Sequence, residues 1–280
     1  MVKLWTEVSG RFLRGRPRVV VVVHWVLIAA AATWCVAAFW FKPNAPKAPD
    51  REIQIARLRE NGVAVRRSDD PVLGPTVMLV SLYPEHFSRD GRLRADILEM
   101  IGPLGNEILS FAHTPFSDEA ISDLLFVETL RGLDLSYTRL TDGGLAQLPS
   151  FPHLELLRLS GCGIGNEGLR HLLPMSDRLR VLYLSWCPIT DDGLKSLIDF
   201  QRLEALKLTG TRISDAGVAH LQTLPALAYL GLDETDVSNE SIETLSHLQG
   251  LRFLDLRRTA VTRWGVELLR ENLPRCVVRY

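Results

Sequence analysis

Residues 179–197 read Leu-Arg-Val-Leu-Tyr-Leu-Ser-Trp-Cys-Pro-Ile-Thr-Asp-Asp-Gly-Leu-Lys-Ser-Leu. Leu182 and Leu184 alternate with other residues, which is typical of a short strand with one apolar face. Thr190 is a good helix N-cap, and the two aspartates after it favour a helix start. The helix would turn its apolar residues back toward the strand. The stretch therefore predicts a strand, a turn and a short helix.

The same stretch recurs along the chain at a nearly constant interval. The pattern L-x-x-L-x-L begins at Leu130, Leu154, Leu179, Leu203, Leu227 and Leu251, with spacings of 24, 25, 24, 24 and 24 residues. A degenerate unit begins at Asn106, and residues 276–280 have the character of a further strand. No single unit can bury both of its faces, so neighbouring units must stack. The pattern predicts an α/β solenoid with a parallel sheet inside an arc and helices outside.

The repeat resembles the leucine-rich repeat family. The consensus L-x-x-L-x-L-x-x-[T/C]-x-I-T-D-x-G-L-x-x-L is most similar to the cysteine-containing subtype known from F-box substrate receptors. Most units have Thr in place of Cys, and no F-box-like segment precedes them. Similar repeats occur in bacterial membrane-anchored proteins, and the excess of Arg (27) over Lys (5) points to a GC-rich genome. The resemblance covers residues 106–275, about seven units, and implies a leucine-rich-repeat solenoid.

The segment before the repeats is predicted to cap the apolar end of the solenoid, because an exposed end is prone to associate. Residues 51–60 and 94–101 have the pattern of helices, and residues 63–65 and 76–82 the pattern of strands. Residues 51–105 are therefore expected to form a small α+β capping region.

The first 50 residues predict a membrane anchor. Residues 19–41 form an uncharged run of 23 residues, which as a helix would span about 34 Å and cross a bilayer core of about 30 Å. Residues 1–18 carry five basic side chains against one acidic, so the positive-inside bias places them in the cytoplasm and the repeats outside it. Residues 42–50 contain three prolines and predict an extended linker. A cleaved signal peptide is the alternative, but the run is longer and ends in bulky residues.

Motifs for catalysis are absent from the sequence. No H-E-x-x-H spacing and no glycine-rich phosphate loop occurs, so we expect no catalytic, cofactor-binding or metal-binding residues. His171 and His220 share a column of the outer helices, and we expect them to be solvated rather than metal-binding. Cys162 and Cys187 stand in one column of adjacent units, where free thiols are expected and a disulfide remains the alternative. The net charge of −1 excludes a generally basic nucleic-acid binder, and no small-molecule substrate is expected.

The inner face of the sheet is the expected functional surface. Aromatic and arginine side chains dominate binding hot spots, and several fall on this face in the predicted register. The candidate partner-binding residues are Tyr137, Arg158, Tyr183, Trp186, Lys207, Tyr229 and Phe253. The sequence therefore predicts a membrane-anchored protein-interaction module with an unknown protein ligand. The alternatives are a structural protein that self-associates in the envelope and, less favoured, an enzyme with its site in residues 51–105.

Overall fold

The structure is a computed structural model that describes residues 51–67, 72, 78–103, 108–127 and 129–280. Its contacts divide the chain into two units, Met1–Pro49 and Asp50–Tyr280. The first unit lies outside the described residues, and so do the predicted basic segment, the anchor and the proline-rich linker. Within the described ranges, none of the helices combines the length and the apolar composition needed to cross a bilayer.

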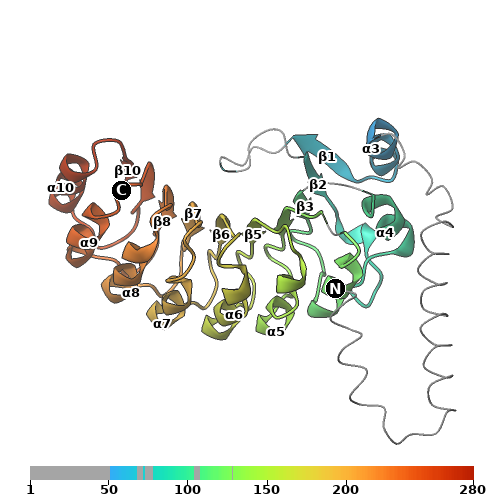
Figure 1. Cartoon of the computed structure of the whole chain (residues 1–280), viewed down its shortest axis with the longest axis horizontal. Coiled ribbons are helices and arrows are strands. Elements are labelled where there is room, and N and C mark those ends of the chain that lie inside the picture. The colour runs from blue at the N-terminus through green and yellow to red at the C-terminus, as the bar shows by residue number, and fades with distance from the viewer. Residues whose placement is uncertain (1–50, 68–71, 73–77, 104–107, 128) are drawn as a thin grey trace, which may run out of the picture. The chain divides into compact units, whose positions relative to one another are not determined.

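Within the described residues, ten short strands form one sheet in sequence order (Figure 1). They are β1 (Ala64–Arg67), β2 (Met78–Ser81), β3 (Ile108–Ser110), β4 (Gly132–Asp134), β5 (Leu156–Arg158), β6 (Val181–Tyr183), β7 (Ala205–Lys207), β8 (Tyr229–Gly231), β9 (Phe253–Asp255) and β10 (Val277–Arg279). Strands β1 and β2 are antiparallel, and every later pair is parallel. The parallel sheet predicted from the repeats is confirmed, and β10 is the strand expected at the end of the chain.

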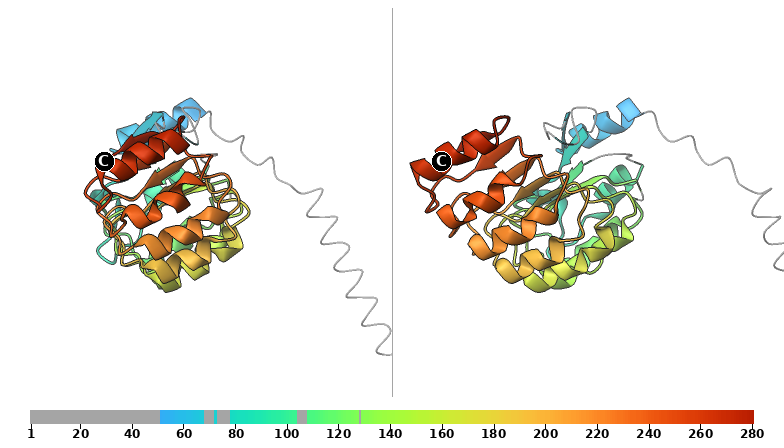
Figure 2. Two further views of the ribbon diagram at one scale, coloured as in Figure 1. Left: turned by 90° about the vertical axis from the view of Figure 1, so that its left-hand side faces the viewer. Right: turned by 60° about the vertical axis from the view of Figure 1, so that its left-hand side comes forward.

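Short helical segments line the side of each coil opposite its strand (Figure 2). The α-helices are α3 (Arg51–Glu60), α4 (Ala95–Ile101), α5 (Asp142–Leu145), α6 (Asn166–His171), α7 (Asp191–Leu194), α8 (Asp215–Ala219), α9 (Ile242–Ser246) and α10 (Arg263–Asn272). Segments of 3₁₀-helix lie at Pro84–His86, Asp118–Leu124, Leu148–Ser150, Leu173–Met175, Lys195–Leu197, His220–Thr223 and Asn239–Ser241. The helices expected at residues 51–60 and 94–101 are α3 and α4. The helices of the repeats are short, because a unit of 24 residues must also hold a strand and two turns.

One apolar core runs through all the coils. The strand leucines Leu133, Leu157, Leu182, Leu206, Leu230 and Leu254 are fully buried. The same cluster begins with Leu58 in α3 and ends with Val278 in β10. Residues of the predicted capping region thus share the core of the repeats.

The aspartate at the start of each outer helix joins its coil to the next one. Asp191 Oδ1 accepts a hydrogen bond from the backbone N–H of Ser214 at 2.8 Å, and Asp191 Oδ2 accepts one from the Ser214 hydroxyl at 2.6 Å. Asp191 and Asp192 lie in the first turn of α7, as expected for charges at a helix start, but they also differ in their other contacts. Asp192 pairs with Lys195 on the same helix, whereas Asp191 anchors the neighbouring coil.

In the part of the chain that the structure describes, six coils use this junction, which we call the Asx bridge. Its acceptors are Asp118, Asp142, Asn166, Asp191, Asp215 and Asn239, and each binds the N-cap residue of the following coil. The bridge requires a small residue three positions after the N-cap residue that it binds, because the carboxylate or amide lies there. That position is Gly144, Gly168, Gly193, Gly217 or Gly265 in five coils, and a Cβ on any of them would overlap the preceding Asp or Asn side chain. In the sixth coil Ser241 stands there and donates its hydroxyl hydrogen to Asp215.

Replacing Asp215 by asparagine is expected to remove part of the acid sensitivity of folding. Burial opposes ionisation of Asp215, but hydrogen bonds from Ser238 and Ser241 outweigh it and hold the pKa of the carboxyl below its ordinary value of 3.8. A lowered pKa in the folded state contributes stability above that ordinary value, and the contribution is lost as the pH falls through the folded pKa. Near pH 7 the Asp215→Asn variant should be less stable by about 1 kcal/mol, and the difference should shrink as the pH falls below 3.8 and through the lowered folded pKa. Urea unfolding across this pH range checks both points, and a difference that is constant with pH would contradict the account.

The Thr and Cys residues that share one position of the repeat form two kinds of hydrogen bond. The hydroxyls of Thr138 and Thr211 donate to carbonyls three residues back in their own coil. The thiols of Cys162 and Cys187 instead donate to carbonyls of the preceding coil, at 3.0 and 3.1 Å. The threonines therefore bond within their own coil, and the cysteines bond across to the preceding coil. Both cysteines are buried and free, and burial raises the pKa of Cys187 to about 12.

Candidate partner-binding surface

The floor of the inner sheet face is more buried than its register predicts. Leu156, Val181 and Ala205 alternate with the core leucines and were expected to face solvent, but all three are fully buried. They form a second apolar cluster with Leu79 and Ile108, against which Val72 packs from the connection between β1 and β2. Tyr183 and Tyr229 also pack against this cluster. The expectation of an open face is therefore corrected for this column, because a segment distant in sequence contributes to its cover.

Aromatic rings continue along the face toward the C-terminal coils. Tyr229 and Phe253 stack in parallel with ring centroids 4.8 Å apart, and Tyr183 lies 6.4 Å from Tyr229. Arg158 lies over the Tyr183 ring at 5.3 Å, and Arg279 lies over Phe253 at 5.0 Å. Burial, with the charges of Asp255 and Asp233, raises the pKa of Tyr229. The structure thus brings four of the predicted residues, Arg158, Tyr183, Tyr229 and Phe253, into one row.

Tyr137 and Trp186 stand apart from this row, at the turn that follows each strand. We call this turn position the rim. Its residues are His113, Tyr137, Gly161, Trp186, Gly210, Glu234 and Arg258, and all seven have a left-handed backbone, with φ between 57° and 69°. Glycine adopts such a conformation without strain, whereas other residues pay for it.

The large rim side chains lie over the small ones. A Cβ on Gly161 would come within 3.1 Å of Tyr137 Cγ, and a Cβ on Gly210 within 2.7 Å of Trp186 Cδ2. Tyr137 also stacks on His113 with centroids 4.6 Å apart. Tyr137 and Trp186 nevertheless remain 47% and 49% exposed. The rim therefore presents two half-exposed aromatic side chains in fixed positions.

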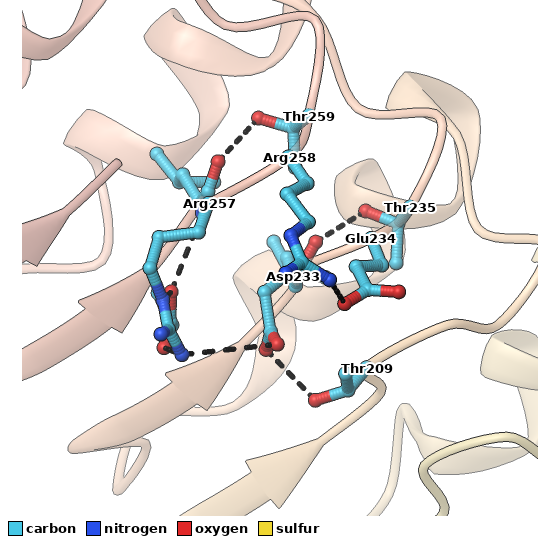
Figure 3. Close-up of polar contacts among 10 residues, drawn as sticks. Thr209, Asp233, Glu234, Thr235, Arg257, Arg258 and Thr259 are labelled. Carbon is cyan, nitrogen blue, oxygen red and sulfur yellow. Dashed lines mark hydrogen bonds and ion pairs between the residues drawn. The ribbon is translucent and has the colours of Figure 1, made fainter.

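The C-terminal end of the face carries a network of acids and arginines (Figure 3). Arg257 donates to both oxygens of Asp255, at 2.8 and 2.7 Å, and lies 4.0 Å from Asp233. Asp233 also accepts a hydrogen bond from Thr209 at 2.8 Å, and Arg258 pairs with Glu234 on the rim. Burial opposes ionisation of Asp255, but the hydrogen bond from Arg257 outweighs it and lowers the pKa of this carboxyl. Each carboxylate of this network thus has a cationic or hydroxyl partner.

A second row of charged side chains lies along the edge of the sheet opposite the rim. Glu155 accepts from Arg131 at 2.7 Å and from Arg180 at 3.3 Å, and Arg180 also donates to Glu204 at 2.6 Å. The alternating signs neutralise one another across four adjacent coils. This row joins neighbouring coils, and sequence inspection missed it although Arg131, Glu155, Arg180 and Glu204 share one column.

The middle of the face contains the last predicted residue, Lys207. It lies beside Tyr183 in the strand register, and its stem crosses Gly231, where an added Cβ would meet Lys207 Cγ at 3.0 Å. Arg158 pairs with Asp134 at 3.8 Å.

Among the described residues, no group of three or more His, Cys, Asp or Glu side chains could hold a metal ion.

These features define the described unit as an α/β solenoid of stacked repeats with its polar and aromatic side chains gathered on the sheet face and rim. The family description that matches the sequence is "FBD-associated F-box protein At5g56370, LRR repeats", over residues 102–190. No curated protein matches the chain.

Solved structures with similar arrangements include two internalins from Listeria monocytogenes. Internalin InlF shares 20% identity, with a TM-score of 0.49, over 71% of this chain and 60% of its own. Internalin C2 shares 22% identity, with a TM-score of 0.48, over 65% of this chain and 71% of its own. The plant peptide hormone receptor RGFR1 in complex with RGF2 shares 17% identity, with a TM-score of 0.41, over 64% of this chain and 32% of its own. The chain thus spans 60% of the length of InlF.

Proposed function

We propose that the chain is a protein-interaction module that binds its partner across the sheet face and the adjoining rim. The observation that carries this proposal is the backbone at Trp186. The fold accepts glycine at the rim, as Gly161 and Gly210 show, yet Trp186 occupies the same left-handed position with φ of 61° and 49% of its surface exposed. Folding stability does not require a strained, half-exposed tryptophan, whereas strain and exposed aromatics are common at binding sites. The proposed module has no catalytic step.

Position-specific photo-cross-linking tests which surface meets the partner. A benzophenone amino acid is placed at position 183 or 186 on the binding side, or at position 264 as the control. Trp264 is a suitable control because it lies on α10 and is 64% exposed. We expect cross-linked protein from positions 183 and 186 and none from position 264. Cross-linking from position 264 alone would contradict the proposal, and a cross-link to a second copy of the chain would support self-association instead.

The proposal includes the N-terminal anchor. The support is the uncharged run at residues 19–41 with its basic N-terminal flank, which would leave the repeats on the extracytoplasmic side. In this arrangement the solenoid is displayed at a membrane surface, facing partners on the far side from the cytoplasm. Retention of the chain in membranes washed with alkaline carbonate, with the repeats open to external protease, is the expected result. Release into the wash would contradict the anchor but not the binding surface.

A further inference from the structure

Lys207 is the cation on the sheet face that the fold leaves without a partner. Its amine makes no hydrogen bond or ion pair with any residue in the described part of the chain. Its stem is nevertheless placed, because Gly231 in the next coil leaves room for it to cross the strand. The only other lysine in the described ranges, Lys195, pairs with Asp192 on the outer helix at 2.6 Å.

The carboxylates on either side of Lys207 are already engaged. Asp134 accepts from the backbone N–H of Ser136 at 3.1 Å and pairs with Arg158. Asp233 accepts from Thr209 and lies beside Arg257. These two carboxylates of the face thus already have partners, and Asp233 Oδ1 lies beside Gly231, which the stem of Lys207 crosses.

Ser185 provides a second donor at the same place. The residue is 5% exposed, and its hydroxyl is buried without a hydrogen-bond partner. Tyr183 pairs with Lys207, and the N–H of Trp186 donates to the Thr209 carbonyl at 2.8 Å. Ser185, two residues after the end of β6, is therefore diagonal to Lys207. Side chains in this relation are within reach of one ligand group. An unpaired buried hydroxyl costs free energy, which an acceptor from a ligand would recover.

We propose that Lys207 and Ser185 form a carboxylate-binding site for an Asp or Glu side chain of the protein partner, which specifies the chemistry of the function proposed above. One cation and one hydroxyl match the single charge of a carboxylate better than the double charge of a phosphate. Tyr183, which packs on the apolar floor beside Lys207, flanks the site and would contact the residues next to the acid. The acidic residue would thus fix the register of the partner on the face.

Binding of defined peptide pools to the full chain tests this site. Three pools of nonapeptides are randomised except at the centre, which is Glu, Gln or phosphoserine. We expect the full chain to bind the Glu pool about five- to tenfold more tightly than the Gln pool. The preference should disappear in Lys207→Gln and should persist in the matched control Lys195→Gln. Ser185→Ala should weaken binding of the Glu pool without lowering the stability of the free protein, because the hydroxyl has no partner there.

Four results would contradict the carboxylate site. Equal binding of the Glu and Gln pools, a preference for phosphoserine, or a Glu preference that survives Lys207→Gln would each overturn the carboxylate site. Absence of binding to every pool would overturn it as well. The photo-cross-links from positions 183 and 186 do not depend on the charge of the partner. If they form while the pools show no acid preference, the binding surface stands and only the carboxylate site fails.

Discussion

Replacing Gly144 by alanine is expected to lower the free energy of unfolding by about 2–3 kcal/mol. The added methyl group would overlap the Asp118 carboxylate and come within 2.6 Å of Leu140 Cδ1. To make room, Asp118 must leave the backbone N–H of Thr141, which it now contacts at 2.9 Å, and the Thr141 hydroxyl at 2.5 Å. The substitution therefore combines overpacking with the loss of one Asx bridge.

The neighbouring glycine provides the control for this prediction. A Cβ on Gly143 would lie 3.4 Å from Asp118 Oδ2 and 3.6 Å from Thr141 Oγ1, which are ordinary contacts. Alanine in a helix is favoured over glycine by about 0.5–1 kcal/mol, so Gly143→Ala should be neutral or stabilising. Both glycines lie in α5, so helix propensity alone predicts the same sign for the two variants. Urea unfolding followed by circular dichroism decides between the accounts, and equal effects of the two substitutions would rule out the Asx bridge as the cause.

The fold could be predicted because its decisive signal is periodic. Columns of Leu at fixed positions in units of 24 or 25 residues determine the strands, their parallel order and the side on which the helices lie. The glycine of I-T-D-x-G-L is visible in the same pattern, but the sequence does not show why glycine is needed there. The reason becomes clear only when Asp191 of one coil is found beside Gly217 of the next.

The candidate site could be predicted only in part. The register placed Arg158, Tyr183, Lys207, Tyr229 and Phe253 on the sheet face, where the structure has them. It did not predict the burial of the floor, because the cover includes Val72, whose position depends on a connection outside the repeat.

The rim also escaped prediction, although a signal for it exists in the sequence. Tyr137 and Trp186 share a column with Gly161 and Gly210. Glycine recurring in a column with large residues indicates a left-handed backbone that the large residues also adopt. The partner-binding role of these residues stays a prediction.

Replacing Tyr183 and Trp186 together by alanine is expected to reduce the affinity for the cross-linked partner roughly 500-fold. Aromatic hot spots contribute about 2 kcal/mol or more each to binding, and 1.4 kcal/mol corresponds to a tenfold change in affinity. Removal of the Trp186 indole also uncovers Gly210. The rim then loses a side chain held in a fixed position as well as the contact area of that side chain. The fold should persist, because neither side chain belongs to the continuous core cluster.

This double variant tests the central claim most directly, when its capture of the partner is measured beside that of the wild-type chain and of Trp264→Ala. The account predicts that Tyr183→Ala/Trp186→Ala loses the partner while its circular-dichroism spectrum is unchanged, and that Trp264→Ala retains the partner in full. Undiminished capture by the folded double variant would contradict the claim that the sheet face and its rim bind the partner.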